Sequence, residues 1–174
     1  MLFDSVVYDT INFGGTDDNG IVWCISDIVG WWDTPPLNQD TISPTSKDGS
    51  VVTASTLAAR ALVMRGTGKA NLGADPAAVF AAYDQLTGIS WPLLSTKTLT
   101  VTEQGTSRTT SVVLAGSVRK QWAGELAFIF EIPLLAEDPR KYSLSASSVP
   151  LTGSGTVTNL GNYPTSPVIT LTDG

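Results

Sequence analysis

The side chains that most often carry out chemistry in proteins are almost absent from this sequence. Its 174 residues include no histidine and one cysteine, Cys24. The lack of histidine removes the usual general base near neutral pH, the Ser-His-Asp and Cys-His catalytic arrangements, and the commonest zinc ligand. Cys24 lies in the apolar run 21–25, which is typical of a buried and inert thiol. We therefore expect no catalytic residue, no metal ligand and no cofactor, and the sequence does not indicate an enzyme.

Two short motifs could bind ligands, but both are better explained as turns. Asp17 and Asp18 stand in a glycine-rich stretch and could offer oxygen ligands to calcium, yet the spacing of a calcium-binding loop is absent. Gly66-Thr67-Gly68-Lys69 resembles part of a phosphate-binding loop, but Val63 occupies the place of that motif's first glycine. Because Asp and Gly are residues that turns require, we predict a turn at each motif.

The tryptophans could form a binding surface. The sequence contains five of them: Trp23, Trp31, Trp32, Trp91 and Trp122. Aromatic faces pack well on the apolar faces of sugars, and large aromatic side chains also concentrate in protein cores and subunit interfaces. Only the Trp31-Trp32 pair falls in a segment that we predict to be an exposed loop. We favour core or interface positions for the tryptophans over sugar binding.

Composition and charge limit the class of protein. Apolar residues make up 42% and charged residues 15% of the chain, as in a folded domain. The net charge of −6 gives the chain no positive field to hold nucleic acid. Residues 1–4 provide no basic leader, and no stretch approaches the roughly 20 apolar residues of a membrane span. We expect no membrane partner and no direct binding of nucleic acid.

Hydrophobic alternation and turn residues predict a mainly β fold. Short apolar segments at 6–8 and 21–25, separated by a run of Gly and Asp, suggest a β-hairpin. The Pro35-Pro36 pair cannot supply ladder donors, so we predict a long loop over 33–50. Residues 56–67 alternate with the period of a strand, and both faces carry apolar side chains.

A single strong helix signal follows. Asp75 can cap a helix, and Pro76 fits its first turn because a proline loses no hydrogen bond there. Apolar residues then recur at helical spacing as far as Leu86. We predict that Gly88 ends the helix in the left-handed conformation.

The chain returns to strands after the helix. Residues 98–102 and 108–118 predict a hairpin with a turn at 103–106. The alternation over 126–132 predicts a strand with one core face, and we expect Pro133 to close it.

A change in composition indicates a domain boundary. Beyond Tyr142 the sequence is rich in Ser, Thr, Gly and small apolar residues. We assign residues 1–147 to a first domain and 148–174 to a linker and the first strands of a second. Residues 156–160 and 167–171 resemble short strands with too little chain to build a core of their own. We therefore expect this second domain to be truncated here.

Six segments of the chain form a recognisable series. In order they are Gly20-Ile21-Val22-Trp23, Ile28-Val29-Gly30-Trp31-Trp32-Asp33-Thr34-Pro35-Pro36, Lys47-Asp48-Gly49, Leu99-Thr100-Val101-Thr102-Glu103, Ala136-Glu137-Asp138-Pro139-Arg140-Lys141-Tyr142 and Asn159-Leu160-Gly161-Asn162-Tyr163-Pro164-Thr165-Ser166-Pro167-Val168-Ile169. This series resembles the distal tail proteins, often called minor tail proteins, of siphophages that infect actinobacteria. Together the six segments cover essentially the whole chain.

The resemblance implies a fold and a role. The first domain would be a tail-tube-like β-sandwich or barrel flanked by one helix, and six copies would form a ring, or belt, at the end of the tail tube. Residues 148–174 would open a galectin-like β-sandwich. The partners implied are other copies of the chain, the tail-tube protein and the other baseplate or tail-tip proteins of the virion, with DNA only as passing cargo. The acidic composition agrees with a channel through which DNA slides, because like charges repel.

We select candidate interface residues from two segments. The segment 30–47 is long, and long loops in compact domains usually serve a purpose. Its candidates are Trp31, Trp32, Pro35 and Pro36. Arg60 and Met64 come from the predicted strand with two apolar faces.

Two alternative functions stay open. A carbohydrate-binding β-sandwich module predicts a monomer whose sugar affinity falls when Trp31 or Trp32 is replaced. A tail-tube subunit predicts long polymers, because its interfaces repeat along an axis without closing. A ring protein predicts one closed oligomer.

Overall fold

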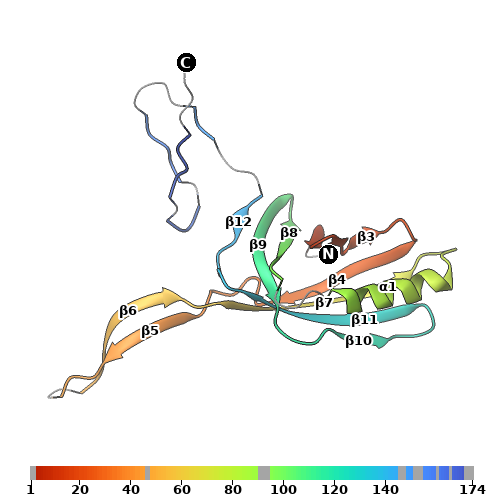
Figure 1. The fold of residues 1–174 in the computed structure, drawn as a ribbon, viewed down its shortest axis with the longest axis horizontal. Helices are drawn as coiled ribbons and strands as arrows, with labels where there is room; N and C mark the ends of the chain where they lie inside the picture. Colours follow the sequence, from red (N-terminus) through yellow and green to blue (C-terminus); the bar gives the residue numbers. More distant parts are fainter. Residues whose placement is uncertain are drawn as a thin grey trace. The chain divides into compact units, whose positions relative to one another are not determined.

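The computed structural model describes residues 3–45, 48–89, 95–144, 148–150, 155–159, 161–164 and 166–170. The chain divides into two units, Met1–Leu144 and Ser145–Gly174. The first unit is mainly β, as the sequence predicted, and carries the helix α1 (Figure 1). Its elements are β1 (Ser5–Tyr8), β2 (Ile11–Asn12), β3 (Gly14–Thr16), β4 (Ile21–Val29), β5 (Leu37–Ile42), β6 (Val51–Leu57), β7 (Arg60–Ala70), α1 (Pro76–Gly88), β8 (Lys97–Glu103), β9 (Thr106–Leu114), β10 (Arg119–Trp122), β11 (Ala127–Ala136) and β12 (Tyr142–Ser143).

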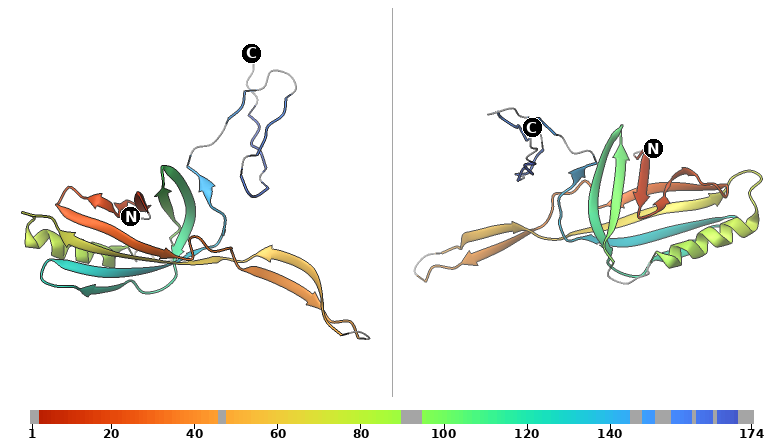
Figure 2. Two further views of the ribbon diagram at one scale, coloured as in Figure 1. Left: turned by 180° about the vertical axis from the view of Figure 1, so that it is seen from behind. Right: turned by 45° about the horizontal axis from the view of Figure 1, so that its top comes forward.

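The main sheet folds into two layers. Its strand order is β2-β1-β8-β9-β11-β7-β4-β3, with β10 paired to β11 and β12 paired to β9. The β8–β9 pair runs across the direction of the long strands β4, β7 and β11 (Figure 2). Each layer turns one apolar face inward, as in an orthogonal β packing. The core lies between these faces, with Val6, Leu99, Val101 and Val112 from one layer and Trp23, Ile28, Met64, Phe128 and Ile132 from the other.

Two glycines in the middle of β7 let aromatic rings approach its backbone. Trp23, Gly68 and Phe128 form one cross-strand row. The rings of Trp23 and Phe128 meet edge to face over Gly68, with centroids 5.6 Å apart. A Cβ at Gly68 would lie 2.3 Å from Phe128 Cζ, and one at Gly66 would lie 2.6 Å from Phe130 Cζ. The turn predicted over 66–69 is therefore wrong, because these glycines serve packing inside a strand.

The long strand β11 confirms one prediction and corrects another. Phe128, Phe130 and Ile132 are buried on its core face, as predicted. Pro133 does not close the strand, which continues to Ala136. The N–H and C=O of a strand residue point to the same side, and the Pro133 carbonyl accepts from Ala115 N on the side away from β7. The missing N–H therefore removes no bond from the ladder to β7.

The helix confirms its predicted start and corrects its predicted end. The Asp75 carboxylate accepts from Ala77 N at 2.9 Å, and Pro76 occupies the first turn. Val79, Ala82 and Leu86 are buried. Gly88 is not among the residues with positive φ, and the helix is instead capped by Ile89 in the right-handed region. Its last turn therefore needs no left-handed residue.

The predicted hairpin between residues 6–8 and 21–25 is wrong. β1 pairs with β2 and β8, and β4 forms its hairpin with β3. The turn predicted at Asp17 and Asp18 does form, because the Asp17 carboxylate accepts from Asn19 N and Ile21 N, each at 2.9 Å. The hairpin of β8 and β9 is confirmed, with Gln104 and Gly105 at positive φ in its turn.

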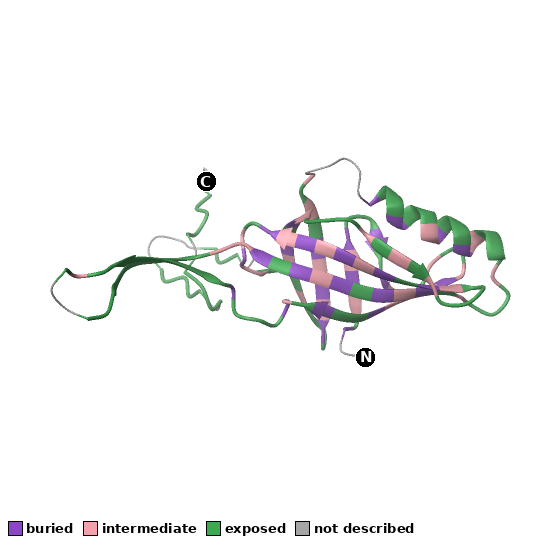
Figure 3. Cartoon of the chain, turned by 90° about the horizontal axis from the view of Figure 1, so that it is seen from below, coloured by how far each residue is buried: buried purple, intermediate pink, exposed green. Residues whose placement is uncertain are grey.

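The long loop predicted over 33–50 is also wrong where the structure describes it. Residues 37–42 and 51–57 form a separate two-stranded sheet, the β5–β6 hairpin. The prolines precede β5 instead of interrupting it. The strand predicted over 56–67 is broken at 58–59, where β6 ends and β7 begins. Every strand residue of this hairpin is exposed (Figure 3).

The second unit contains no strand or helix among its described residues. The strands predicted over 156–160 and 167–171 are absent from 156–159 and 167–170, and residues 160 and 171 lie outside the described residues. The two-domain assignment with a galectin-like second part stays a prediction. Within the described residues, no helix is long and apolar enough to cross a membrane.

Candidate interface at the hairpin and its root

The β5–β6 hairpin exposes apolar side chains that nothing in the described residues covers. The exposed fractions are 54% for Leu37, 61% for Ile42, 57% for Val51, 50% for Val52 and 36% for Leu57. Leu37 pairs with Leu57 at one end, and Ile42 pairs with Val51 at the other. A two-stranded hairpin without further packing is marginally stable in water. A partner that covered these side chains would stabilise it.

Arg60 fixes the hairpin root, which we define as residues 30–36 between β4 and β5. It is the first residue of β7, and only 5% of it is exposed. Its Nη1 donates to the carbonyl oxygens of Gly30 and Trp31 at 3.0 Å and of Asp33 at 2.9 Å. These bonds offset part of the cost of removing the guanidinium from water.

Trp31 lies at the centre of the root and is fully buried. Its indole Nε1 donates to the Glu103 carboxylate, which is itself buried at the end of β8. Lys141 Nζ donates to the Trp31 carbonyl at 2.8 Å and lies 4.5 Å from the ring centroid. Burial, and then the charge of Arg60, lowers the pKa of Lys141, while the Glu103 carboxylate opposes this shift.

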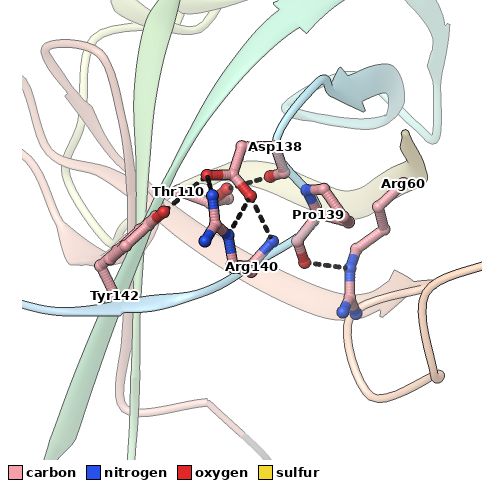
Figure 4. A network of polar contacts seen from close by, with 6 residues as sticks. All are labelled: Arg60, Thr110, Asp138, Pro139, Arg140 and Tyr142. Carbon is pink, nitrogen blue, oxygen red and sulfur yellow. Dashed lines mark hydrogen bonds and ion pairs between the residues drawn. The ribbon is translucent and has the colours of Figure 1, made fainter. Parts of the chain in front are cut away.

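Arg60 also bonds to the exit segment, which we define as residues 137–141 between β11 and β12. Arg60 Nε donates to the Pro139 carbonyl at 3.0 Å (Figure 4). The Asp138 carboxylate beside it accepts from Arg140 Nε at 2.8 Å, from Arg140 Nη2 at 3.0 Å and from the Tyr142 hydroxyl at 2.5 Å. The bond from Arg140 is the largest cause that lowers the pKa of Asp138 to about 2. The same carboxylate raises the pKa of Tyr142.

The six predicted interface residues separate into two groups. Trp31, Arg60 and Met64 are buried within the chain, and so is Pro35. Trp32, with an exposed fraction of 52%, and Pro36 lie at the surface. The interface role of Trp32 and Pro36 stays a prediction.

Sequence reasoning missed the polar partners of the root. Glu103 and Lys141 lie far from Arg60 along the chain, so no local pattern joins them. One available signal was the charge of Arg60 itself, placed among the apolar residues of 57–64. A charge at such a position suggests a buried polar network. Of the other tryptophans, Trp23 is in the core, Trp122 is partly buried, and Trp91 lies outside the described residues.

A groove of about 420 Å³ opens on the outer face of the long strands. Its lining includes Arg65, Thr67, Arg119, Gln121 and Glu131. The Glu131 carboxylate lies 2.9 Å from Arg65 Nε and 3.6 Å from Arg119 Nη1, so it neutralises part of the positive charge. The described residues contain no group of three or more His, Cys, Asp or Glu side chains that could hold a metal ion. The groove is therefore a surface of mixed charge.

Comparison with known proteins gives a likeness of fold. The sequence matches no model of a known protein family and no curated protein. The structure is similar to the crystal structure of the Dit protein of phage SPP1, which is described as a paradigm of the hub adsorption apparatus in phages that infect Gram-positive bacteria. The TM-score is 0.58 at 15% sequence identity, and the match covers 80% of this chain and 51% of that chain. The chain thus spans about half the length of the phage protein.

Proposed function

We propose that this chain is a structural subunit of a phage tail tip, and that six copies form a ring that joins the tail tube to the baseplate and leaves a channel for DNA. The observation that carries the proposal is the β5–β6 hairpin, whose apolar side chains are exposed on the isolated chain while its root is held by buried hydrogen bonds. The fold shared with the SPP1 hub protein supports the same role. The proposed location is the virion, and the proposed partners are the tail-tube protein and the other tail-tip proteins.

The edges of the long-strand layer favour assembly. In the described part of the chain, β3 pairs only with β4, and β10 pairs only with β11. Each therefore has one edge that no described strand pairs with, where another chain could add. Different edges at opposite sides of one layer suit a head-to-tail contact, which gives a ring when the rotation between neighbours closes.

The outer face of these strands suits a channel that DNA crosses without being held. Arg65 and Arg119 share this face with Glu131 by strand register, and Asp27 is the partner of Arg65 on β4. Because positive and negative side chains alternate here, the face has little net attraction for a phosphate backbone. DNA is therefore proposed as passing cargo and not as a bound ligand.

Light scattering across a concentration series, checked by negative-stain imaging, tests the ring. We expect a closed particle with the mass of about six chains and a central hole. Ile42→Asp, on the hairpin, should reduce assembly, because the charge would be buried against the neighbour. Ile169→Asp is the matched control, since Ile169 is also an exposed isoleucine, with an exposed fraction of 79%, and lies outside the first unit.

Other results would favour the two alternatives. Long polymers would indicate a tail-tube subunit, because an interface that repeats along an axis does not close. A monomer at every concentration would contradict self-assembly into a ring. If that monomer bound glycans and lost the binding on Trp32→Ala, the exposed Trp32 would support a carbohydrate-binding module instead.

A further inference from the structure

Arg60 joins two segments that are far apart in the sequence. Among the described residues, its hydrogen bonds all go to backbone carbonyl oxygens, and it forms no ion pair with a carboxylate. Three of these oxygens belong to the hairpin root, and the fourth is that of Pro139 in the exit segment. Because the guanidinium is a rigid planar fork, it cannot follow one segment without disturbing its bonds to the other.

Lys141 provides a second link between the same two segments. Its ammonium group donates to the Trp31 carbonyl and packs over the ring of Trp31. It also lies 5.8 Å from the ring centroid of Trp32. The root is therefore attached to the exit segment at two points, one through a side chain of β7 and one through the exit segment's own lysine.

The exit segment is stiffened from its other side. The Asp138 carboxylate holds the guanidinium and the backbone N–H of Arg140, and it accepts from the hydroxyl of Tyr142. The Asp138 carbonyl accepts from Thr110 Oγ1 on β9 at 3.5 Å. The residues that flank Pro139 are thus fixed, so its carbonyl presents a well-placed acceptor to Arg60.

We propose that Arg60 is a positioning residue that couples the hairpin root to the exit segment, so that loosening either segment loosens the other. The coupling is a property of the single chain and does not depend on assembly. Its consequence rests on the proposed function: when the hairpin docks on a neighbouring subunit, the exit segment, which leads to the second unit, becomes more rigid. The bond network supplies the physical path for this effect.

Hydrogen exchange of the full chain tests the coupling without changing Arg60, because the exit segment is loosened by substitution and the response is measured in the root. Asp138→Ala removes the partner of Arg140 and Tyr142 and leaves every bond to the root in place. We expect exchange of the Trp31 amide, which donates to Ile28 O at 3.1 Å, to rise by roughly threefold or more. Asp84→Ala is the control, because Asp84 is an exposed carboxylate that lies 3.8 Å from Lys120. It should change neither segment.

A rise confined to the exit segment, or no rise in either segment, would overturn the coupling. So would a rise at Trp31 that merely equals the rise of the core amides of β7 and β11, because that result reports general destabilisation. Arg60→Met should raise exchange in both segments together, and Arg119→Met, which removes an exposed arginine, should raise it in neither. Light scattering on each sample shows whether assembly has changed. A result that contradicts the coupling is therefore distinguishable from one that contradicts assembly into a ring.

Discussion

The main sheet and the β5–β6 hairpin use the same secondary structure under opposite conditions. In β7 buried side chains alternate with exposed or partly exposed ones, and the inward ones pack between two layers. In β5 and β6 every residue is exposed. Apolar area removed from water is the main stabilising contribution to a fold, at about 25 cal/mol per Å². The main sheet is therefore stabilised by burial within the single chain, whereas the hairpin depends on its root and on a partner that covers it.

This comparison predicts that single substitutions will have large effects in one region and almost none in the other. The largest effect is expected for Trp23→Ala, because Trp23 is buried against Phe13, Phe128 and Phe130 and donates to the Asp17 carboxylate at 2.9 Å. The free energy of unfolding should fall by about 3–5 kcal/mol, as measured by urea denaturation. Trp32→Ala, at an exposed position of the root, should cost less than about 1 kcal/mol. Equal losses would contradict the difference between the regions.

A substitution that adds one carbon tests the packing over β7. Gly68→Ala places a methyl group against the Phe128 ring, whose Cζ would lie 2.3 Å away, and this ring is fully buried. We expect a loss of up to about 3 kcal/mol in the free energy of unfolding, from displacement of the ring. Gly88→Ala is the control, because beyond its chain neighbours and its own helix backbone no atom of the described residues lies within 4 Å of its added Cβ. Equal melting temperatures for the two variants would show that the Phe128 side chain moves aside without loss of stability.

The same change in the two regions sharpens the comparison further. Val101→Thr places a hydroxyl in the core, where Val101 is fully buried, and should cost about 1–2 kcal/mol. Val52 lies on the hairpin and half of it is exposed. Val52→Thr should therefore change the free energy of unfolding by less than about 0.5 kcal/mol. Chemical denaturation of the dilute monomer measures both. A loss at Val52 as large as that at Val101 would mean that the hairpin is packed within the single chain.

The smallest effect is expected at the exit segment, and it depends on pH. The folded pKa of Asp138 is about 2, below its ordinary value of 3.8. A lowered pKa stabilises the folded state above pH 3.8, and this contribution disappears as the pH falls towards 2. Asp138→Asn should therefore reduce stability at neutral pH by less than about 1 kcal/mol, because the carboxylate is partly exposed. A difference from the parent chain that persists unchanged at pH 2 would contradict this assignment.

Much of the first unit could be predicted from local sequence. Neighbours within a few residues determine the start of α1 at Asp75-Pro76, the turn at Gln104 and Gly105, and the core face of β11. Packing between distant strands decided what local sequence could not. Gly66 and Gly68 resemble turn residues until the aromatic rings of β4 and β11 are placed over them. Pro133 suggests a strand end until its missing N–H is seen to face away from β7.

The candidate site was predicted less well than the fold. The interface role of the segment 30–47 stays a prediction, and of its candidates Trp31 and Pro35 are buried while Trp32 and Pro36 are exposed; Arg60 and Met64 are buried. Exposure depends on what the rest of the chain covers, so no local pattern could separate Trp31 from Trp32.

The sequence by itself determined that the chain lacks histidine and paired cysteines, that it alternates as a mainly β protein, and where its helix begins, because composition and short-range spacing are sufficient for these. Only the tertiary structure decided that residues 37–42 and 51–57 pair as an exposed hairpin, and that Arg60 ties its root to Pro139. Those features come from contacts between residues far apart in the sequence, whose distances are set only when the layers pack.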